Sequence, residues 1–529
     1  MTMLNDLAFS LGDEVVTNPK LPAIKGPVFN QDSTEFFFVN PASRMGPDLI
    51  DEYIDSLAAV GVKTFVSCGN GQRTNYPSDV WQWDWEGYEP NGPDTQPLLN
   101  VSTGGVPASM DRQRMESLRT LADMGIDFHQ QAFRRCRHHG IAAWMSVRMN
   151  DVHGCTDHGS PMLSDFYVEQ RNLSNVRSPH RLEEMWWSEH ALDWERPEVQ
   201  EHFTKLVCEQ LERFDMDGLE LDWMRFVYHF RPGRELAGGR ELTKWMRFVR
   251  ERCDRAAKRL GHPVALSVRV PVCPEVARRC GLDAVAWAEA GLVDLVVATP
   301  FWATTDFDIP VASWRRQLKG TKAKLAVGLE VRYQPIPNGP VQLITPNLTL
   351  GAAANVLSEG ADAVYLFNFY PTSISLLREW TWEDFSQTIG ALQCLAEIEK
   401  QQRTHAVTFR DIRAPGEPAM HALPAWDSRE NFQWPPGCLL RVSTGKLPRA
   451  GFSARLRLKF DRVPSEISLL KIFCNGRLLA QAVPLSEMEY GYDVPVDHLE
   501  EGAQLFELVS DDTFRVIQVE IDFTPLAVR

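Results

Sequence analysis

The sequence predicts a (β/α)8 barrel, also called a TIM barrel, followed by an antiparallel β-sandwich. Between about residues 33 and 400, eight short apolar segments alternate with segments of helical periodicity, and this alternation is typical of a parallel barrel. Residues 405–529 instead contain short alternating stretches separated by turn residues, the pattern of an antiparallel sandwich. Residues 1–32 are expected to form a polar lead-in.

The predicted barrel begins with a strand at EFFFVN, residues 35–40. Its other strands are expected at residues 62–70, 141–151, 214–226, 263–271, 293–302, 324–333 and 361–370. The helices are expected at residues 47–60, 115–139, 197–213, 240–260, 282–290, 309–318, 349–359 and 382–400. The strands are apolar along nearly their whole length, as strands covered on both faces of a parallel sheet are.

Composition and charge argue against some classes of binding partner. A formal net charge of −15 and the lack of a basic run argue against nucleic-acid binding. No run of about 18 apolar residues is present, so we expect no spanning helix and no membrane partner. The ten cysteines show neither a CxxC pair nor metal-ligand spacing, and the N-terminus lacks a signal-peptide pattern. We therefore expect a cytoplasmic protein without a cofactor, and the sequence leaves open whether it forms a homo-oligomer.

The predicted fourth strand, in FDMDGLELDWMRF at residues 214–226, carries two carboxylates on one face. Side chains alternate along a strand, so Glu220 and Asp222 point the same way and the neighbouring leucines point the other way. Catalytic groups of TIM barrels lie at the C-terminal ends of the strands. Two carboxylates at this end indicate acid–base or nucleophilic chemistry on a glycosidic bond, although Glu220 alone is equally compatible with a buried ion pair.

The predicted seventh strand places a third carboxylate, Glu330, at the same end of the barrel and across its mouth from Asp222. We expect Asp222 to be the nucleophile and Glu330 the general acid/base, by analogy with barrels whose strand-four aspartate attacks the anomeric carbon. The reverse assignment also fits the sequence, and Glu330 could instead pair with an inward arginine. Glu220 is expected to be a supporting acid. The sequence leaves open whether the reaction retains or inverts the anomeric configuration.

Further polar and aromatic side chains are expected to bind the substrate. Inward arginines need anionic partners, which the barrel acids could supply, or else they could receive a carboxylate or sulfate of the substrate. The expected substrate-binding residues are Asn40, Arg148, Asn150, Asp151, His153, Arg269, Trp302, Arg332, Asn368 and Tyr370. The loop after the third strand carries His153, Cys155, His158 and His180, but their spacing fits no standard zinc site, and we expect no metal.

Two long predicted loops follow the second and third strands, at residues 71–114 and 152–194. They carry Trp81, Trp83, Trp85, Trp186 and Trp187. Loops after barrel strands emerge on the catalytic face, so we expect these loops to enclose a pocket that admits a terminal sugar or a short oligosaccharide. The expected enzyme is therefore exo-acting. Alternatives from other classes are a non-catalytic carbohydrate-binding barrel and a metal-dependent sugar lyase or isomerase.

The fourth-strand motif also resembles a known group of proteins. DMDGLELDWMRF is similar to the strand-four signature DG-x-x-x-D-x-x-R of the family-10-like glycosyl hydrolases, which Asp217, Gly218, Asp222 and Arg225 match. WMSVRMNDVH, residues 144–153, resembles the third-strand segment of bacterial relatives of that group. The resemblance spans about residues 34–395 and implies a (β/α)8 barrel that acts on a glycoside. The pattern of chitinase-type barrels would require a glutamate at Met224 and an aspartate at Glu220, so substrate-assisted chitinase chemistry is not expected.

Overall fold

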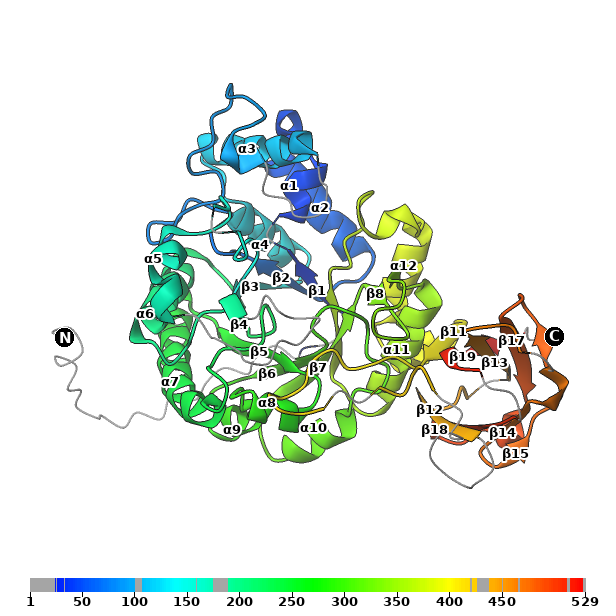
Figure 1. The fold of residues 1–529 in the computed structure, drawn as a ribbon. Coiled ribbons are helices and arrows are strands. Elements are labelled where there is room, and N and C mark those ends of the chain that lie inside the picture. Colours follow the sequence, from blue (N-terminus) through cyan, green and yellow to red (C-terminus); the bar gives the residue numbers. More distant parts are fainter. Residues whose placement is uncertain are drawn as a thin grey trace.

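The computed structural model confirms a closed eight-stranded parallel barrel followed by two antiparallel sheets (Figure 1). It describes residues 24, 26–32, 34–99, 107–157, 159–174, 189–418, 421–425, 437–449, 451–464, 467–510 and 514–526. The barrel strands are β1 (Val28–Gln31), β2 (Thr64–Cys68), β3 (Ala142–Arg148), β4 (Gly218–Asp222), β5 (Ala265–Pro271), β6 (Leu295–Thr299), β7 (Lys324–Glu330) and β10 (Ala363–Phe367). Seven of the eight strands lie within the predicted ranges.

The first predicted strand is wrong. Residues 35–39 form the short helix α1 (Glu35–Val39), and the first barrel strand is β1, which lies within the predicted lead-in. The run of three phenylalanines suggested a strand, but Phe36 and Phe37 pack their rings on the aromatic ring of Phe128, the first residue of helix α4 (Phe128–His138). β1 was not predicted as a strand because it has only four residues, of which one is asparagine and one is glutamine.

The helices surround the barrel (Figure 1). They are α2 (Pro47–Ala59), α3 (Ala108–Asp123), α4 (Phe128–His138), α5 (Asp165–Ser174), α6 (Pro197–Arg213), α7 (Glu235–Leu260), α8 (Pro274–Arg279), α9 (Ala284–Glu289), α10 (Val311–Gln317), α11 (Pro346–Ser358), α12 (Trp382–Ala391) and α13 (Leu395–Ile398). The predicted helix at 115–139 is divided into α3 and α4 because Gly125 takes a left-handed conformation, φ +70°. None of the helices in the described ranges has the length and apolarity needed to cross a membrane.

The barrel interior is apolar at the base and polar toward the C-terminal ends of the strands. An apolar cluster that includes Val28, Trp144 and Leu295 fills the base. The glycine of the DG motif, Gly218, makes room for the Trp144 ring, because a Cβ at residue 218 would lie 2.4 Å from that ring. Side chains one layer higher, such as Glu220, are polar and fully buried. The apolar base therefore supports a layer of charged groups at the mouth.

The C-terminal domain is a sandwich of two antiparallel sheets, which lies beside the barrel (Figure 1). One sheet contains β11 (Arg403–Ala406), β19 (Val516–Pro525), β13 (Phe452–Phe460), β17 (Glu489–Val494) and β16 (Val483–Pro484). The other contains β12 (Gly437–Gly445), β18 (Gly502–Val509), β14 (Lys471–Cys474) and β15 (Arg477–Leu478). Helix α11 of the barrel packs closely on β11, because a Cβ at Gly351 would lie 1.9 Å from the Thr404 carbonyl oxygen.

Candidate active site

Strand register brings the predicted charged residues together at the barrel mouth. Asp222 at the end of β4 pairs in register with Arg148 of β3 on one side and with Arg269 of β5 on the other. On the far side of the barrel, Glu330 at the end of β7 pairs with Phe367 of β10. All five residues lie at the C-terminal ends of their strands, where TIM barrels place their catalytic groups.

Both carboxylate oxygens of Asp222 accept hydrogen bonds. Oδ1 accepts from the backbone N–H of Met224 at 3.0 Å, and Oδ2 accepts from Nη1 of Arg269 at 2.6 Å. The Arg269 side chain is 0% exposed, and its guanidinium lies 4.0 Å from the ring centroid of Phe367. Arg269 was predicted to bind the substrate, but this burial places it against Asp222, where it orients and neutralises the carboxylate.

Glu330 has a different environment. Its Oε1 accepts hydrogen bonds from the Val331 backbone N–H at 2.9 Å and from Nδ2 of Asn368 at 3.3 Å. Its Oε2 is buried and has no hydrogen-bond partner within the described residues. Burial raises the pKa of Glu330 to about 7, and the positive charges of Arg332 and Arg225 oppose that rise. A carboxyl group with a pKa near neutrality can both donate and accept a proton.

Two of the predicted residues position Glu330. Tyr370 donates its O–H to Oδ1 of Asn368 at 2.8 Å, and Nδ2 of Asn368 donates to Glu330. Asn368 takes a left-handed backbone conformation, φ +63°, which asparagine tolerates better than most residues do. The hydrogen-bond chain Tyr370–Asn368–Glu330 therefore fixes the acid in orientation from the β10 side.

Glu220 lies one layer below Asp222 and is completely buried. Its Oε1 accepts hydrogen bonds from the hydroxyls of Ser146 and Tyr365, both at 2.8 Å. Burial raises the pKa of Glu220; Arg269 opposes this rise and the neighbouring Asp222 adds to it. These contacts hold Glu220 inside the barrel and give it the position expected of a supporting acid.

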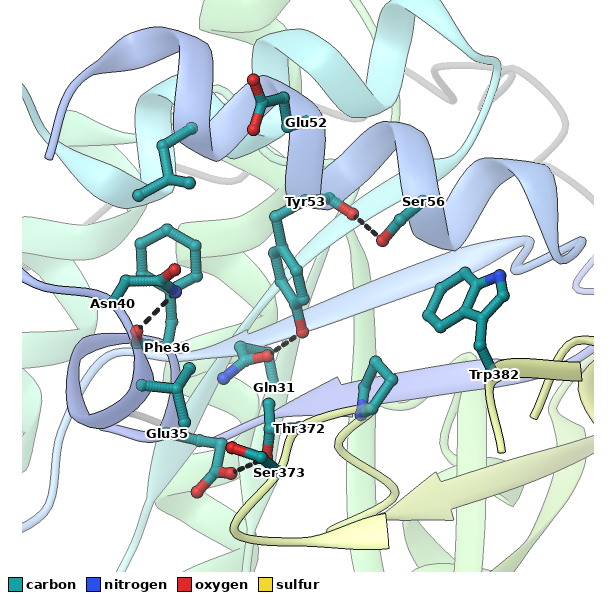
Figure 2. A pocket seen from close by; sticks show the side chains of 13 residues that line it. Gln31, Glu35, Phe36, Asn40, Glu52, Tyr53, Ser56, Thr372, Ser373 and Trp382 are labelled. Atoms are coloured by element: carbon teal, nitrogen blue, oxygen red, sulfur yellow. Dashed lines mark hydrogen bonds between the residues drawn. The ribbon is translucent and has the colours of Figure 1, made fainter. Parts of the chain in front are cut away.

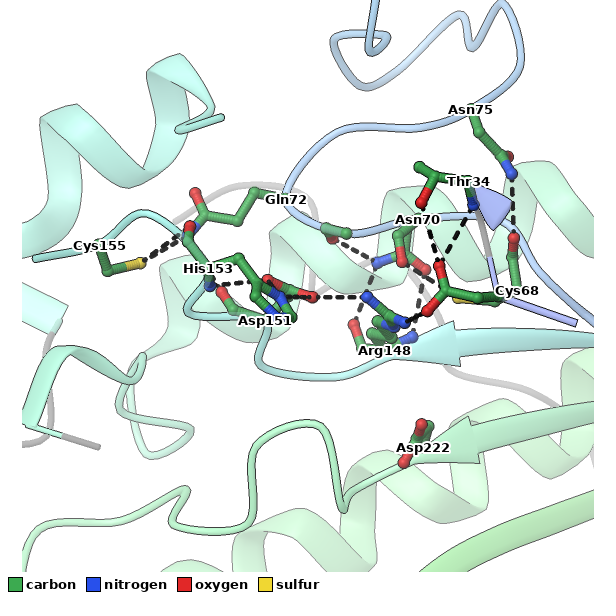
Figure 3. Close-up of polar contacts among 12 residues, drawn as sticks. Thr34, Cys68, Asn70, Gln72, Asn75, Arg148, Asp151, His153, Cys155 and Asp222 are labelled. Carbon is green, nitrogen blue, oxygen red and sulfur yellow. Dashed lines mark hydrogen bonds and ion pairs between the residues drawn. The ribbon is translucent and has the colours of Figure 1, made fainter. Parts of the chain in front are cut away.

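Arg148 organises the β1–β3 side of the mouth (Figure 3). Its Nη1 donates to Oδ2 of Asp151 at 3.0 Å, and its Nη2 donates to Asp32. Asp151 also contacts Nδ1 of His153 at 2.8 Å. Burial alone would raise the pKa of Asp151, but the charges of His153 and Arg148 outweigh it and lower that pKa. Figure 3 shows no contact between Asp222 and this network; Asp222 accepts its hydrogen bond from Arg269 instead.

An aromatic and cationic rim covers the β4–β7 side of the mouth. The Arg332 guanidinium stacks on the Trp302 ring at 4.0 Å from its centroid, and Trp302 is 40% exposed. Arg332 belongs to the short strand β8 (Arg332–Tyr333), which pairs with β9 (Gln342–Leu343) directly after β7. Because Arg332 covers one face of Trp302, a sugar would have to stack on the other face.

The segment that leaves the sandwich strand β11 returns to this rim and fixes it. Asp411 accepts hydrogen bonds from three consecutive backbone N–H groups, those of residues 301–303, at 3.0, 2.7 and 2.9 Å. Arg410 also forms an ion pair with Asp306, whose oxygen lies 3.1 Å from Nε. The position of Trp302 is therefore set by a chain segment more than 100 residues away in sequence.

Two predicted substrate-binding residues lie away from the charged groups of the mouth. Asn150 is buried beyond the end of β3, where its side-chain amide pairs with the backbone of Leu192 at 2.9 and 2.7 Å. It therefore anchors the chain before α6. Asn40 follows helix α1 and donates to the Phe36 carbonyl oxygen at 2.9 Å, because the strand that would have pointed it at the mouth does not exist.

Asn40 instead lines a separate cavity of about 290 Å³ beside the barrel, between α1, α2 and the chain after β10 (Figure 2). Tyr53 donates its O–H to Gln31 inside this cavity, and Thr372 donates to Glu35. Burial raises the pKa of Glu35 to about 7. The cavity opens beside β1 and β10, away from Asp222 on β4.

The tryptophans of the first long loop do not line the mouth as predicted. Trp81 is buried and stacks on His202 of α6 with ring centroids 4.1 Å apart, and Trp83 packs edge-on against Trp85 at 5.1 Å. These rings complete the packing outside the barrel. The predicted residues Trp186, Trp187, His158 and His180 lie outside the described residues.

Sequence reasoning missed Asp32 and did not assign a role to Arg225. Asp32 follows β1 directly, so locating the first strand at residues 28–31 would have found it. The sequence indicated Arg225 only as the last position of the strand-four motif, and the structure shows that its side chain is buried at the mouth. Across the described part of the chain, no group of three or more His, Cys, Asp and Glu side chains has the arrangement needed to hold a metal ion.

A comparison with solved structures finds similar chains at low sequence identity. The chain is similar to α-L-fucosidase isoenzyme 2 from Paenibacillus thiaminolyticus, at 13% identity and a TM-score of 0.42, over 71% of this chain and 49% of that one. It is also similar to the PgaB (BpsB) glycoside hydrolase domain from Bordetella bronchiseptica, at 10% identity and a TM-score of 0.38, over 69% and 99% of the two chains. A variant of the GH36 α-galactosidase from Geobacillus stearothermophilus shares 11% identity at a TM-score of 0.36, over 92% and 55%.

The likeness is one of fold alone. At these identities and TM-scores, the activities named for those proteins are not transferred to this chain. No family model and no curated protein matches the sequence. The resemblance to the family-10-like glycosyl hydrolases therefore stays a prediction.

Proposed function

We propose that the protein is a glycoside hydrolase whose nucleophile is Asp222 and whose general acid/base is Glu330. The observation that carries this proposal is the difference between the two carboxyl environments. Asp222 accepts a charge-assisted hydrogen bond from Arg269 at 2.6 Å. Glu330 is buried, has a pKa raised to about 7, and keeps one oxygen without a partner in the described structure. Glycosidases use such pairs of carboxyl groups, one ionised and one protonated.

Each group then has one role in bond cleavage. Glu330 donates its proton to the glycosidic oxygen as the bond from that oxygen to the anomeric carbon breaks. Asp222 attacks the anomeric carbon and forms a glycosyl ester, and the deprotonated Glu330 next takes a proton from the water that hydrolyses this ester. The second step returns both groups to their starting state. Arg269 keeps Asp222 oriented, and Asn368 does the same for Glu330.

The test uses a panel of aryl glycosides and three isosteric variants. Asp222→Asn and Glu330→Gln should each lower turnover by at least about 100-fold with the fold retained, because each removes a charge or a proton needed in the transition state. Glu251→Gln, an exposed glutamate on α7, is the matched control and should keep wild-type turnover. Folded Asp222→Asn and Glu330→Gln proteins with wild-type turnover would refute the assignment.

We further propose exo-action on a terminal sugar or a short oligosaccharide. The loops after β2 and β3 support this proposal because they hydrogen-bond to each other: Gln72 donates to the Asp151 carbonyl oxygen at 3.0 Å and accepts from the Ser164 N–H at 3.2 Å. The ion pair of Asp151 with Arg148 joins these loops to the β3 side of the mouth, and Asp411 fixes Trp302 on the β6 side. Digestion of a long polysaccharide and of its dimer separates the alternatives. Release of single terminal sugars is expected, whereas a rapid fall in polymer length would contradict exo-action.

A further inference from the structure

Arg225 is a buried cation for which the described part of the chain provides no anionic partner. It follows β4 at the mouth, its side chain is 6% exposed, and its guanidinium lies over the rings of Phe226 and Phe367, at 5.4 and 5.3 Å from their centroids. Its Nε is buried without a hydrogen-bond partner, and the described residues provide no ion pair for this guanidinium. Burying a charge without a partner is costly, so this arrangement requires a compensating function.

Three of the carboxylates that attract Arg225 are bound to other arginines. Asp32 and Asp151 both pair with Arg148, and Asp222 pairs with Arg269. These acids act on Arg225 only through longer-range attraction, while Arg148 repels it and, together with burial, lowers its pKa. No carboxylate among the described residues pairs with the planar fork of this guanidinium, which suits two oxygens of one anion.

Arg332, on the same rim, is a second cation. It stacks on Trp302 at 4.0 Å, and it likewise forms no ion pair with any residue that the structure describes. Aromatic residues connect the two arginines. The ring of Phe226, which Arg225 covers, lies 5.4 Å from the ring of Phe301, and Phe301 directly precedes Trp302. Both arginines also act on the carboxyl group of Glu330. Their positive charges therefore reach the proposed general acid.

We propose that the site binds a sugar that carries an anionic group, either a uronate carboxylate or a sulfate ester. Arg225 binds this group, and Arg332 provides a second positive charge for it. This inference rests on the proposed glycosidase function, because it names the class of substrate for the same site. A neutral sugar would supply hydroxyls but would leave the two charges uncompensated in a largely buried rim. An anionic substituent compensates them and aligns the ring between Asp222 and Glu330.

Binding measurements by calorimetry on the full chain test the inference, with D-glucuronate, D-galacturonate and D-glucose 6-sulfate as probes and D-glucose and D-galactose as neutral controls. At least one anionic sugar should bind about 10-fold more tightly than its neutral counterpart or better, and this preference should shrink as salt is added. Whichever anionic probe binds identifies the carboxylate or the sulfate as the recognised group. Equal affinity for the charged and neutral sugars would overturn the inference.

Variants assign the binding to the two arginines. Arg225→Gln and Arg332→Gln should each weaken the binding of the anionic sugar about 10-fold and weaken the binding of its neutral counterpart by less. Arg225→Lys, which keeps the charge but loses the fork, should recover only part of the affinity. Arg278→Gln, on the surface of α8, is the control and should bind as the wild type does. If Arg225→Gln does not fold, Arg332→Gln and Arg225→Lys carry the test. Unchanged affinity in the folded variants would refute the assignment.

The proposed function can fail separately from this inference. If no aryl glycoside is cleaved although anionic sugars bind through Arg225, the site is an anionic-sugar site and hydrolysis is refuted. If aryl glucosides are cleaved with loss of activity in Asp222→Asn, but glucuronides and sulfated glycosides are neither bound nor cleaved, hydrolysis stands and the anionic substrate is refuted.

Discussion

Nη1 of Arg269 lies 2.6 Å from Oδ2 of Asp222, and the two side chains are 0% and 2% exposed. The pair exists because residues 222 and 269 are register neighbours on β4 and β5. Two other nitrogens of Arg269, Nε and Nη2, are buried without hydrogen-bond partners in the described structure. Arg269 therefore depends on Asp222 for its charge compensation, and Asp222 depends on Arg269 for its orientation.

This pairing predicts that Arg269→Gln lowers both stability and activity. Removing one partner of a buried ion pair leaves the other charge uncompensated, and typically costs about 3–5 kcal/mol in the free energy of unfolding. Urea denaturation measures this cost. The double variant Arg269→Gln/Asp222→Asn should regain part of the lost stability, because neither charge then remains. Arg278→Gln, from the exposed pair with Glu275, serves as the control and should change stability by less than about 1 kcal/mol. A wild-type unfolding curve for Arg269→Gln would contradict the prediction.

The hydrogen bond from Asn368 to Glu330 predicts a shift in the pH–activity profile. This bond lowers the pKa of Glu330, so Asn368→Gly should raise that pKa. Glycine suits the left-handed backbone at residue 368 and removes only the side chain. If Glu330 is the general acid, activity falls as pH rises through its pKa, and the basic limb of the profile should move upward by about 0.5 pH unit in the variant.

Asn338→Gly provides the matched control for this measurement, because Asn338 also has a positive φ, +60°, and lies in the loop between β8 and β9. Its profile should coincide with that of the wild type. A basic limb that moves downward in Asn368→Gly, or does not move, would show that Asn368 has no influence on the acid that limits activity.

The raised pKa of Glu330 also predicts a pH-dependent stability. The folded protein holds this proton up to about pH 7, whereas the ordinary pKa of the group is 4.5. The folded state therefore binds more protons between these two values, and the stability contributed by Glu330 is complete below pH 4.5 and is lost as pH rises through about 7. The shift corresponds to about 3 kcal/mol.

Glu330→Gln removes this titration, so the stability of the wild type relative to the variant should fall steadily as pH rises through that window. Thermal or urea unfolding of both proteins across the window measures the difference. Glu251→Gln should run parallel to the wild type. A constant difference between Glu330→Gln and the wild type would mean that Glu330 titrates at its ordinary pKa in the folded protein.

The sequence by itself determined the barrel and the faces of its strands. Apolar runs alternating with helical segments bury their surface in a parallel sheet covered by helices, and eight such units favour the closed barrel that the structure confirms. The two-residue period of a strand was enough to place Glu220 and Asp222 on the inner face. The same period placed Glu330 at the inner end of β7. The first strand was predicted at the wrong residues, because tertiary packing of Phe36 and Phe37 stabilises a helix where local propensity favours a strand.

Only the tertiary structure decided which charges are paired. From the sequence, Arg148 could have formed an ion pair with any of several acids. It pairs with Asp32 and Asp151 because Asp32 lies where β1 ends and Asp151 lies where the chain turns after β3. Arg269 reaches Asp222 through strand register, while no residue that the structure describes forms an ion pair with Arg225, although Arg225 is closer to Asp222 in sequence. Hydrogen bonds and ion pairs depend on distances of a few ångströms between segments far apart in the chain, and no local pattern in the sequence encodes those distances.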